Sequence, residues 1–258
     1  MSIVHRLKNN LAVFALRKAY HYYTHYRTDP SQTPYQEEFR QILETGITVI
    51  PNFINSEKVE QIREAVYPAL VQLRENRYKG KGKGVRFTEE GVFRLESIDQ
   101  AVPLVKDFFD HPLPTTLAKA YVSPKAVSYK RLAELRTGVG RVSEADWPHM
   151  DDWRHRFKAF MYLPSVGENQ APFVYYAGSH RQGWWRLHKE IEHRQYGGGG
   201  PILTPPQLEY LMKRYGFQKQ VITGEPGTLI LFDGRGIHHG TPLRSGERVI
   251  MVSYFDRR

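Results

Sequence analysis

The stretch that decides the fold is Trp147–His180, with the sequence WPHMDDWRHRFKAFMYLPSVGENQAPFVYYAGSH. Near its start, His149 and Asp151 flank Met150. Successive side chains of an extended strand point to opposite faces, so His149 and Asp151 face the same way. An imidazole and a carboxylate placed like this can occupy neighbouring positions around a metal ion. Because His-x-Asp is a common tripeptide, the rest of the chain has to support a metal site.

A second group of residues near the C-terminus gives that support. The segment Gly227–Pro242, GTLILFDGRGIHHGTP, holds an apolar run followed by His238 and His239, and Arg248 comes ten residues after His238. These residues lie on or beside runs that are typical of buried strands. One more imidazole would complete a two-histidine, one-carboxylate facial triad, which suits non-haem Fe(II) that activates dioxygen.

Together these phrases resemble the phytanoyl-CoA dioxygenase family of Fe(II)- and 2-oxoglutarate-dependent oxygenases. The resemblance covers roughly residues 35–258. Its phrases are Gly46–Phe53, Pro148–Asp151, Phe173–His180 and Gly227–Phe255. It implies a mainly β fold with flanking helices: a double-stranded β-helix barrel of the jelly-roll, cupin-like type, preceded by N-terminal helices. We expect a single domain over residues 1–258.

The resemblance also implies roles for particular residues. Fe(II) would be held by His149, Asp151 and His238. Arg248 would bind the distal carboxylate of 2-oxoglutarate, because a guanidinium offers two parallel hydrogen bonds to a carboxylate. His239 competes with His238 for the third ligand position, but the family phrase Gly-Ile-His-x-Gly matches His238. The implied cofactors are Fe(II), 2-oxoglutarate as co-substrate, and O2.

Further candidates rest on weaker signals. Phe160 falls where the family places an aromatic ring against the co-substrate, and Thr241 or Ser253 would add a hydroxyl donor. Arg131 would reach the co-substrate if its strand turns it inward, and an outward Arg131 is the open alternative. We interpret His180 as structural, because the triad has better donors. The candidate substrate-binding residues are Trp153, Trp184, Trp185, Lys81 and Arg94.

The implied reaction hydroxylates a small molecule while 2-oxoglutarate is converted to succinate and CO2. Halogenating relatives lack the carboxylate ligand, so the presence of Asp151 favours hydroxylation. Epoxidation, desaturation and ring closure stay open, because they use the same iron. Two alternatives remain, a non-catalytic jelly-roll binding protein and a nucleic-acid-directed oxygenase. The chain lacks a clear platform of aromatic residues interleaved with basic ones, so we do not expect a nucleic-acid partner.

The amino-acid composition restricts the class of protein and the ligands that it attracts. The 258 residues suffice for one large domain, and 40% hydrophobic and 13% aromatic residues are typical of a globular protein. The lack of cysteine excludes disulfides and thiol catalysis, and it fits a cytoplasmic location. A net charge of +10 attracts anions. Our substrate hypothesis is therefore an anionic or carrier-protein-linked small molecule, of secondary-metabolite or lipid-like type.

Three segments stand apart from the expected barrel. Residues 1–28 contain no acidic residue and predict a basic amphipathic helix. We favour docking of this helix on its own barrel or on a second subunit over peripheral membrane contact; the oligomeric state stays open. Residues 181–206 predict an insert or lid. Lys79–Arg86, KGKGKGVR, predicts a mobile cationic loop, either plain surface or a lid over an anionic substrate.

Overall fold

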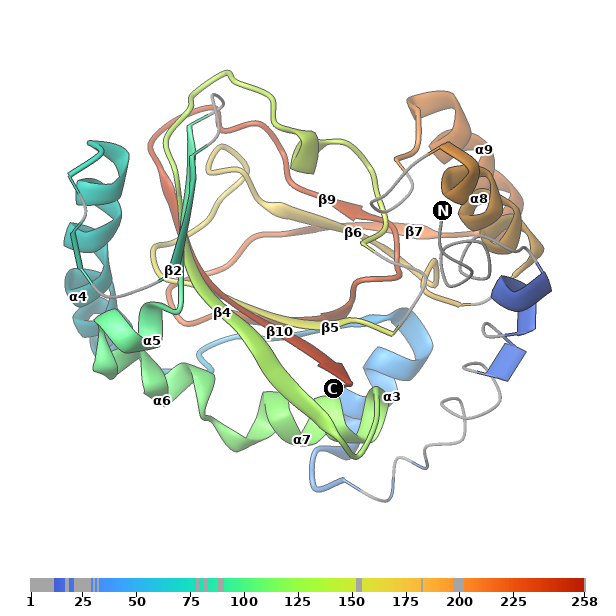
Figure 1. The fold of residues 1–258 in the computed structure, drawn as a ribbon, viewed down its shortest axis with the longest axis horizontal. Coiled ribbons are helices and arrows are strands. Elements are labelled where there is room, and N and C mark those ends of the chain that lie inside the picture. Colours follow the sequence, from blue (N-terminus) through green and yellow to red (C-terminus); the bar gives the residue numbers. More distant parts are fainter. Residues whose placement is uncertain are drawn as a thin grey trace, which may run out of the picture.

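The structure is a computed structural model that describes most of the chain (Figure 1). The described residues are 12–16, 19–20, 29, 31, 33–77, 79–80, 83–87, 91–151, 155–181, 183–196 and 202–257.

Two antiparallel sheets form the barrel. The strands are β1 (Ile47–Ile50), β2 (Lys83–Phe87), β3 (Val92–Glu96), β4 (Ala126–Arg136), β5 (Phe157–Tyr162), β6 (Phe173–Ala177), β7 (Gln218–Ile222), β8 (Leu229–Asp233), β9 (His238–His239) and β10 (Arg248–Arg257). The larger sheet has seven strands in the order β1-β8-β5-β10-β4-β3-β2, and the smaller has three in the order β7-β6-β9. Figure 1 shows β6, β7 and β9 on the side of the large sheet away from its helices.

Strand alternation divides the core into two parts. On β5, Phe157, Ala159 and Met161 point outward into a cluster shared with helices, whereas Phe160 and Tyr162 point into the barrel. The interior cluster also takes Phe173 from the small sheet, so it joins both sheets. This is the period of two that strand geometry imposes.

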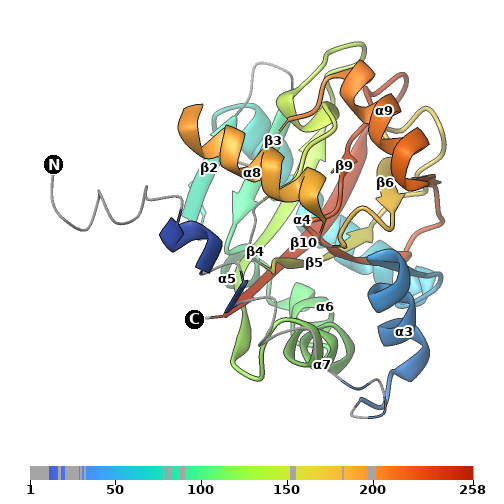
Figure 2. The same cartoon turned by 90° about the vertical axis from the view of Figure 1, so that its right-hand side faces the viewer.

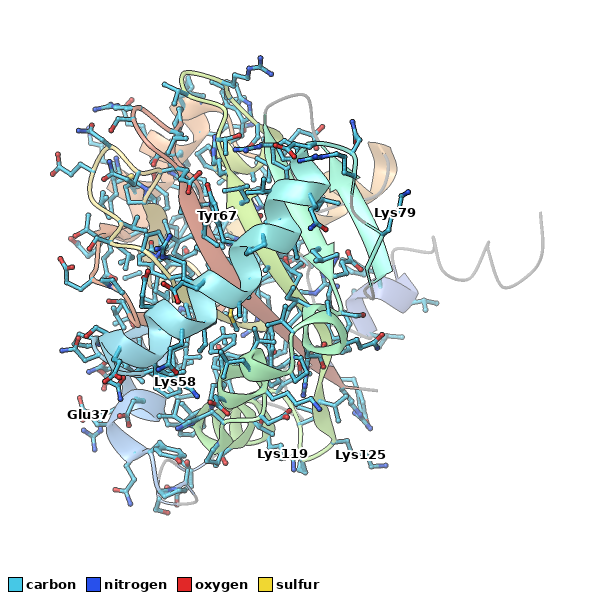
Figure 3. The ribbon with its side chains drawn as sticks, turned by 90° about the vertical axis from the view of Figure 1, so that its left-hand side faces the viewer. Glu37, Lys58, Tyr67, Lys79, Lys119 and Lys125 are labelled. Carbon is cyan, nitrogen blue, oxygen red and sulfur yellow. The ribbon has the colours of Figure 1, made fainter. Side chains whose placement is uncertain are left out.

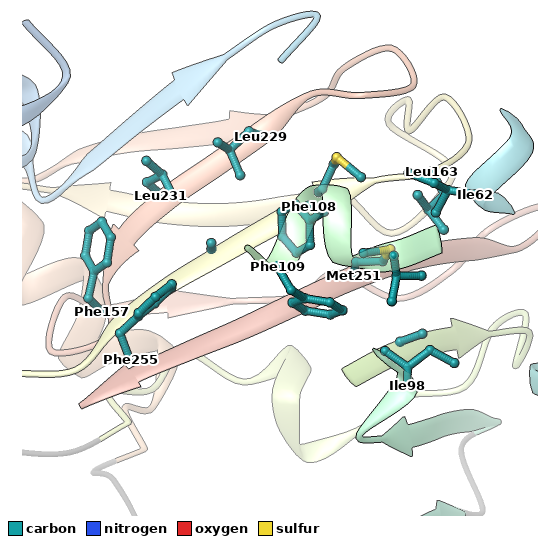
Figure 4. Close-up of a cluster of buried hydrophobic side chains, with 14 of the residues drawn as sticks. Ile62, Ile98, Phe108, Phe109, Phe157, Leu163, Leu229, Leu231, Met251 and Phe255 are labelled. Carbon is teal, nitrogen blue, oxygen red and sulfur yellow. The ribbon is translucent and has the colours of Figure 1, made fainter. Parts of the chain in front are cut away.

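Helices cover the outer face of the large sheet. They are α4 (Ser56–Arg74), α5 (Ile98–Ala101), α6 (Lys106–Phe109) and α7 (Pro112–Tyr121), with the 3-10 turn η2 (Pro103–Val105) between them. Figure 4 shows Phe108 and Phe109 among the strand residues of this core. A second short 3-10 turn, η3 (Glu144–Asp146), lies in the loop after β4.

Helix α4 packs one apolar stripe against the outer face of the large sheet. The Asn55 side chain accepts a hydrogen bond from Lys58 N at 2.8 Å, which caps the first turn. One stripe of the helix is fully buried, and it consists of Val59, Ile62, Val66 and Leu70. Tyr67 of the same helix is labelled in Figure 3. Its hydroxyl donates to Glu247 at 2.9 Å. The buried residues recur every three or four positions in the sequence, which is the spacing of one helical face.

Helices α8 (Trp184–Tyr196) and α9 (Pro205–Tyr215) lie together beside the small sheet (Figure 2). Residues of α9 share a buried cluster with Met150, Val174 and Ile237, so the pair rests on the outer side of β6. The sequence predicts an insert or lid over residues 181–206 and no helix at the position of α8. The role of residues 181–206 as an insert or lid stays a prediction.

The cationic loop differs from expectation. Strand β2 occupies Lys83–Phe87 and pairs with β3 in antiparallel register, so the end of the glycine-alternating stretch extends the large sheet. The register shifts between Lys83 and Val85, at the one glycine that β2 contains. Lys81 lies outside the described residues.

Of the N-terminal segment, residues 12–16 are helical and Phe14 is buried. Most of the predicted basic helix lies outside the described residues. Within the part of the chain that the structure describes, there is no helix with the length and apolar character needed to cross a membrane.

His180 fastens the turn after β6 to helix α3 (Gln36–Thr45). Its Nε2 lies 3.1 Å from the carbonyl oxygen of Leu43. Gly46 ends α3 with a φ of 87°, and a β-carbon there would collide with Tyr175 and His180. Burial lowers the pKa of His180 from 6.5 to about 4. The structural interpretation of His180 agrees with these contacts.

Between pH 7 and pH 5 an unfolded His180 takes up a proton, whereas the folded ring, with its pKa near 4, stays neutral. The free energy of unfolding should therefore fall by about 2 kcal/mol over this range because of His180 alone. We expect urea titrations of His180→Gln to show a smaller drop by that amount. His188→Gln, at an exposed position on α8, should keep the full drop. Equal drops for wild type and His180→Gln would contradict the account.

Candidate metal centre

Three side chains from two distant segments converge inside the barrel. His149 and Asp151 come from the loop before β5, and His238 opens β9. One ligand atom from each lies within 4.8 Å of the others. His238 Nε2 is 3.7 Å from Asp151 Oδ2, and the two imidazole rings are 4.5 Å apart between centroids. The structure thus brings together the three ligands that the sequence predicts.

The backbone holds these segments in register. His149 N donates to His238 O at 3.0 Å, and His238 N donates to His149 O at 2.9 Å. Asp151 N donates to Gly234 O at 2.8 Å. A β-carbon at position 234 would collide with the Asp151 carboxylate, so this close approach requires glycine.

Both imidazoles are oriented by main-chain carbonyls. The Nδ1 of His149 lies 2.8 Å from the carbonyl oxygen of Trp147, and the Nδ1 of His238 lies 2.8 Å from that of Gly236. A carbonyl oxygen only accepts, so each Nδ1 carries the proton and each Nε2 keeps its lone pair for a metal. Burial, with His238 nearby, lowers the pKa of His149 to about 3, so this ring is neutral at physiological pH.

Lys158 on β5 supports the third ligand. Its Nζ donates to Asp151 Oδ1 at 2.7 Å and lies 2.6 Å from Oδ2. Burial alone would raise the pKa of Asp151, but Lys158 and His238 hold it far below its usual range. The carboxylate therefore stays ionised. Sequence reasoning missed Lys158, although it shares the inward parity of Phe160 on the same strand.

A cavity of about 190 Å³ adjoins the triad. Of the predicted co-substrate and substrate residues, it is lined by Phe160, Arg94 and Arg248. His239 also reaches it, and its Nε2 is 3.3 Å from the hydroxyl of Tyr176.

Arg248 is already paired in this cavity. Its Nη1 donates to Ala171 O at 2.5 Å and its Nη2 to Glu134 Oε1 at 2.7 Å. Arg94 Nε donates to the other oxygen, Glu134 Oε2, at 2.6 Å. Burial would raise the pKa of Glu134, but Arg94 and Arg248 outweigh it and lower the pKa to about 2. Glu134 is a second residue that sequence reasoning missed.

Arg131 lies on the outer, helix-covered face of the large sheet. Its guanidinium pairs with Asp99 at 3.2 Å and with Asp110 at 2.8 Å. The inward positions of β4 are instead Glu134 and Arg136. The prediction of an inward Arg131 had the strand parity reversed, and the outward alternative describes its position.

Other predicted residues lie away from the cavity. The Thr241 hydroxyl donates to Pro172 O at 3.1 Å, and the Ser253 hydroxyl is 2.8 Å from that of Ser128. Trp184 is 85% exposed, and Trp185 packs its ring 5.5 Å from that of Phe217. None of these four predicted residues lines the cavity. Trp153 lies outside the described residues.

Comparison with solved structures identifies the architecture. The epimerase SnoN, in complex with Fe3+, alpha ketoglutarate and nogalamycin RO, aligns with a TM-score of 0.61 at 13% identity, over 88% of this chain and 84% of SnoN. The jelly-roll prediction is confirmed. HygX from Streptomyces hygroscopicus, with nickel, 2-oxoglutarate and hygromycin B bound, gives a TM-score of 0.58 at 15% identity, over 85% of this chain and 86% of HygX.

EctD from S. alaskensis with bound Fe gives a TM-score of 0.59 at 13% identity, over 85% of this chain and 75% of EctD. At these identities the similarity establishes the fold. No protein-family model matches the chain, and no curated protein matches it by sequence.

The Lys158–Asp151 pair generates a stability prediction. Lys158→Met leaves a buried carboxylate without its cation, so we expect a loss of about 3 kcal/mol in the free energy of unfolding of the metal-free protein. Lys130→Met is the matched control, because Lys130 pairs with Glu96 on the same sheet but both side chains are about 30% exposed. That variant should lose about 1 kcal/mol or less.

Added Ni(II) should restore more stability to Lys158→Met than to Lys130→Met, since a bound cation compensates Asp151. Chemical denaturation with and without the metal measures both effects. Equal losses in the two variants would refute the assigned role of Lys158.

Proposed function

We propose that the protein is an Fe(II)- and 2-oxoglutarate-dependent oxygenase that acts on a small-molecule substrate. The observation that carries this proposal is the convergence of His149, Asp151 and His238 with both Nε2 lone pairs free to bind a metal. Two imidazole nitrogens and one carboxylate oxygen suit Fe(II) and leave coordination positions open. The neighbours solved with Fe, nickel and 2-oxoglutarate support the proposal.

Arg248 is our proposed anchor for the distal carboxylate of 2-oxoglutarate. Its Nε is buried and has no hydrogen-bond partner among the described residues, so a donor remains for an incoming carboxylate. Phe160 and Phe173 line the same cavity and form an apolar part of its wall. When bound, Fe(II) and 2-oxoglutarate supply the oxidising chemistry, with uptake of O2 and release of succinate and CO2.

The chain's own residues then have distinct tasks. His149, Asp151 and His238 hold the metal, and Lys158 keeps the Asp151 carboxylate ionised and oriented. We favour hydroxylation, because Asp151 retains the carboxylate ligand. The sequence phrases that resemble the phytanoyl-CoA dioxygenase family support membership of that family. The fold also serves an epimerase, SnoN, so substrate placement decides the outcome.

For the substrate we propose an anionic or carrier-linked small molecule in a cytoplasmic setting, in keeping with the net charge of +10 and the lack of cysteine. The whole chain would form one domain, with residues 181–206 as the lid over the substrate. Helix α8 in that segment presents Trp184 to solvent.

An anaerobic titration tests the proposal. Fe(II) added to metal-free protein, followed by 2-oxoglutarate, should produce the weak visible metal-to-ligand charge-transfer band of the chelate. We expect His238→Ala and Arg248→Ala to abolish the band at moderate 2-oxoglutarate, because each loses a contact to metal or co-substrate. His239→Ala should retain it, since His239 is assigned no ligand role. A wild-type protein without the band would refute the proposed function.

A further inference from the structure

Arg94, Glu134 and Arg248 form a charged row across three neighbouring strands of the large sheet. Strand β3 brings Arg94 opposite Glu134 of β4, and β10 brings Arg248 beside them. Glu134 accepts from Arg94 at 2.6 Å through one oxygen and from Arg248 at 2.7 Å through the other. Two guanidinium groups and one carboxylate leave this row with a net charge of +1.

The remaining charges along the cavity balance in pairs. Arg136 donates to both oxygens of Asp146, at 2.7 and 2.5 Å, and Lys158 is paired with Asp151. Among the described residues, the uncompensated charge of the cavity is therefore that of the row. It lies where Arg248 keeps its buried Nε without a partner.

We propose that Glu134 sets the charge of this anion subsite at +1, so that it accepts one carboxylate group and discriminates against sulfate- and phosphate-like dianions. The inference rests on the proposed function, in which a carboxylate of 2-oxoglutarate binds at Arg248. One carboxylate makes the subsite neutral. A dianion would leave a surplus negative charge in a buried place, which is unfavourable.

Glu134 also has a task before any anion arrives. Only 8% of the Arg248 side chain is exposed, and a buried guanidinium without a counter-charge would destabilise the fold. Arg94 is 27% exposed, so its side chain stands nearer to the solvent. Glu134 thus compensates Arg248 in the empty cavity while leaving one positive charge to attract the ligand.

Two isosteric substitutions should shift binding in opposite directions. Glu134→Gln raises the charge of the row to +2, and we expect the affinity for 2-oxoglutarate to rise about tenfold. Coulomb energy scales with ligand charge, so the affinity for sulfate, a dianion, should rise about a hundredfold. Arg94→Gln lowers the charge to zero and should weaken 2-oxoglutarate binding about tenfold. The double variant retains Arg248 alone, at +1, and should bind almost as wild type does.

The measurement is the Kd of 2-oxoglutarate from the anaerobic charge-transfer titration with Fe(II), repeated with sulfate as competitor. Glu96→Gln is the matched control, because Glu96 lies on β3 next in line to Arg94 but pairs with Lys130 away from the cavity. It should leave both affinities unchanged. Thermal unfolding of each variant checks that the barrel is intact.

The outcomes distinguish failure of the proposed function from failure of the role assigned to Glu134. Wild-type protein that binds no 2-oxoglutarate would overturn the proposed function and this inference with it. Binding by wild type, combined with weaker binding in both Glu134→Gln and Arg94→Gln, would overturn the inference alone and make Glu134 a scaffold for the arginines. If Glu134→Gln does not fold, the double variant decides, because loss of binding there contradicts the charge argument.

Discussion

The reciprocal backbone pairing of His149 and His238 is the constraint on which the site depends. These residues stand far apart in the chain, and two hydrogen bonds of 3.0 and 2.9 Å fix their register. A slip of either segment by one residue would turn its imidazole away from the centre, because side chains alternate along a strand. The carbonyls of Trp147 and Gly236 then set each ring's rotation through Nδ1. Main-chain geometry therefore shapes the ligand set before any metal binds.

Strand and helix periodicity made much of the fold predictable from sequence. The apolar run of β8 was located correctly because it is continuous in the sequence, and the buried residues of α4 recur at helical spacing. Helix α8 was missed because its charged sequence carries little apolar signal, and part of its support comes from Trp185 against Phe217. The β2 strand was missed because the alternating glycines and lysines that lead into it give no apolar pattern, whereas its pairing with β3 uses backbone groups.

Some residues of the site could likewise be predicted from the sequence, and others could not. Motif spacing pointed to His149, Asp151 and His238, which lie together in the structure. Lys158 and Glu134 could not be assigned from spacing, because their significance comes from partners on other strands. Arg131 shows what strand alternation cannot predict. An alternating pattern states which residues share a face, but it does not state which face points into the barrel. From Leu132 to Arg136 the residues on both sides of β4 are buried, one side against helices and the other against the cavity.

Charge balance inside the barrel connects stability to chemistry. An unpaired buried charge is unfavourable, so each interior cation has a carboxylate beside it, as Lys158 has Asp151 and Arg248 has Glu134. The two groups differ in the net charge that remains after pairing. The first is neutral until a metal adds positive charge, and the second retains +1. Two separate positive centres inside one cavity match a ligand with a carboxylate at each end, one at the metal and one at Arg248. Under the proposed function, the pairs that allow the metal-free barrel to fold thus also select a dicarboxylate as the molecule that completes it.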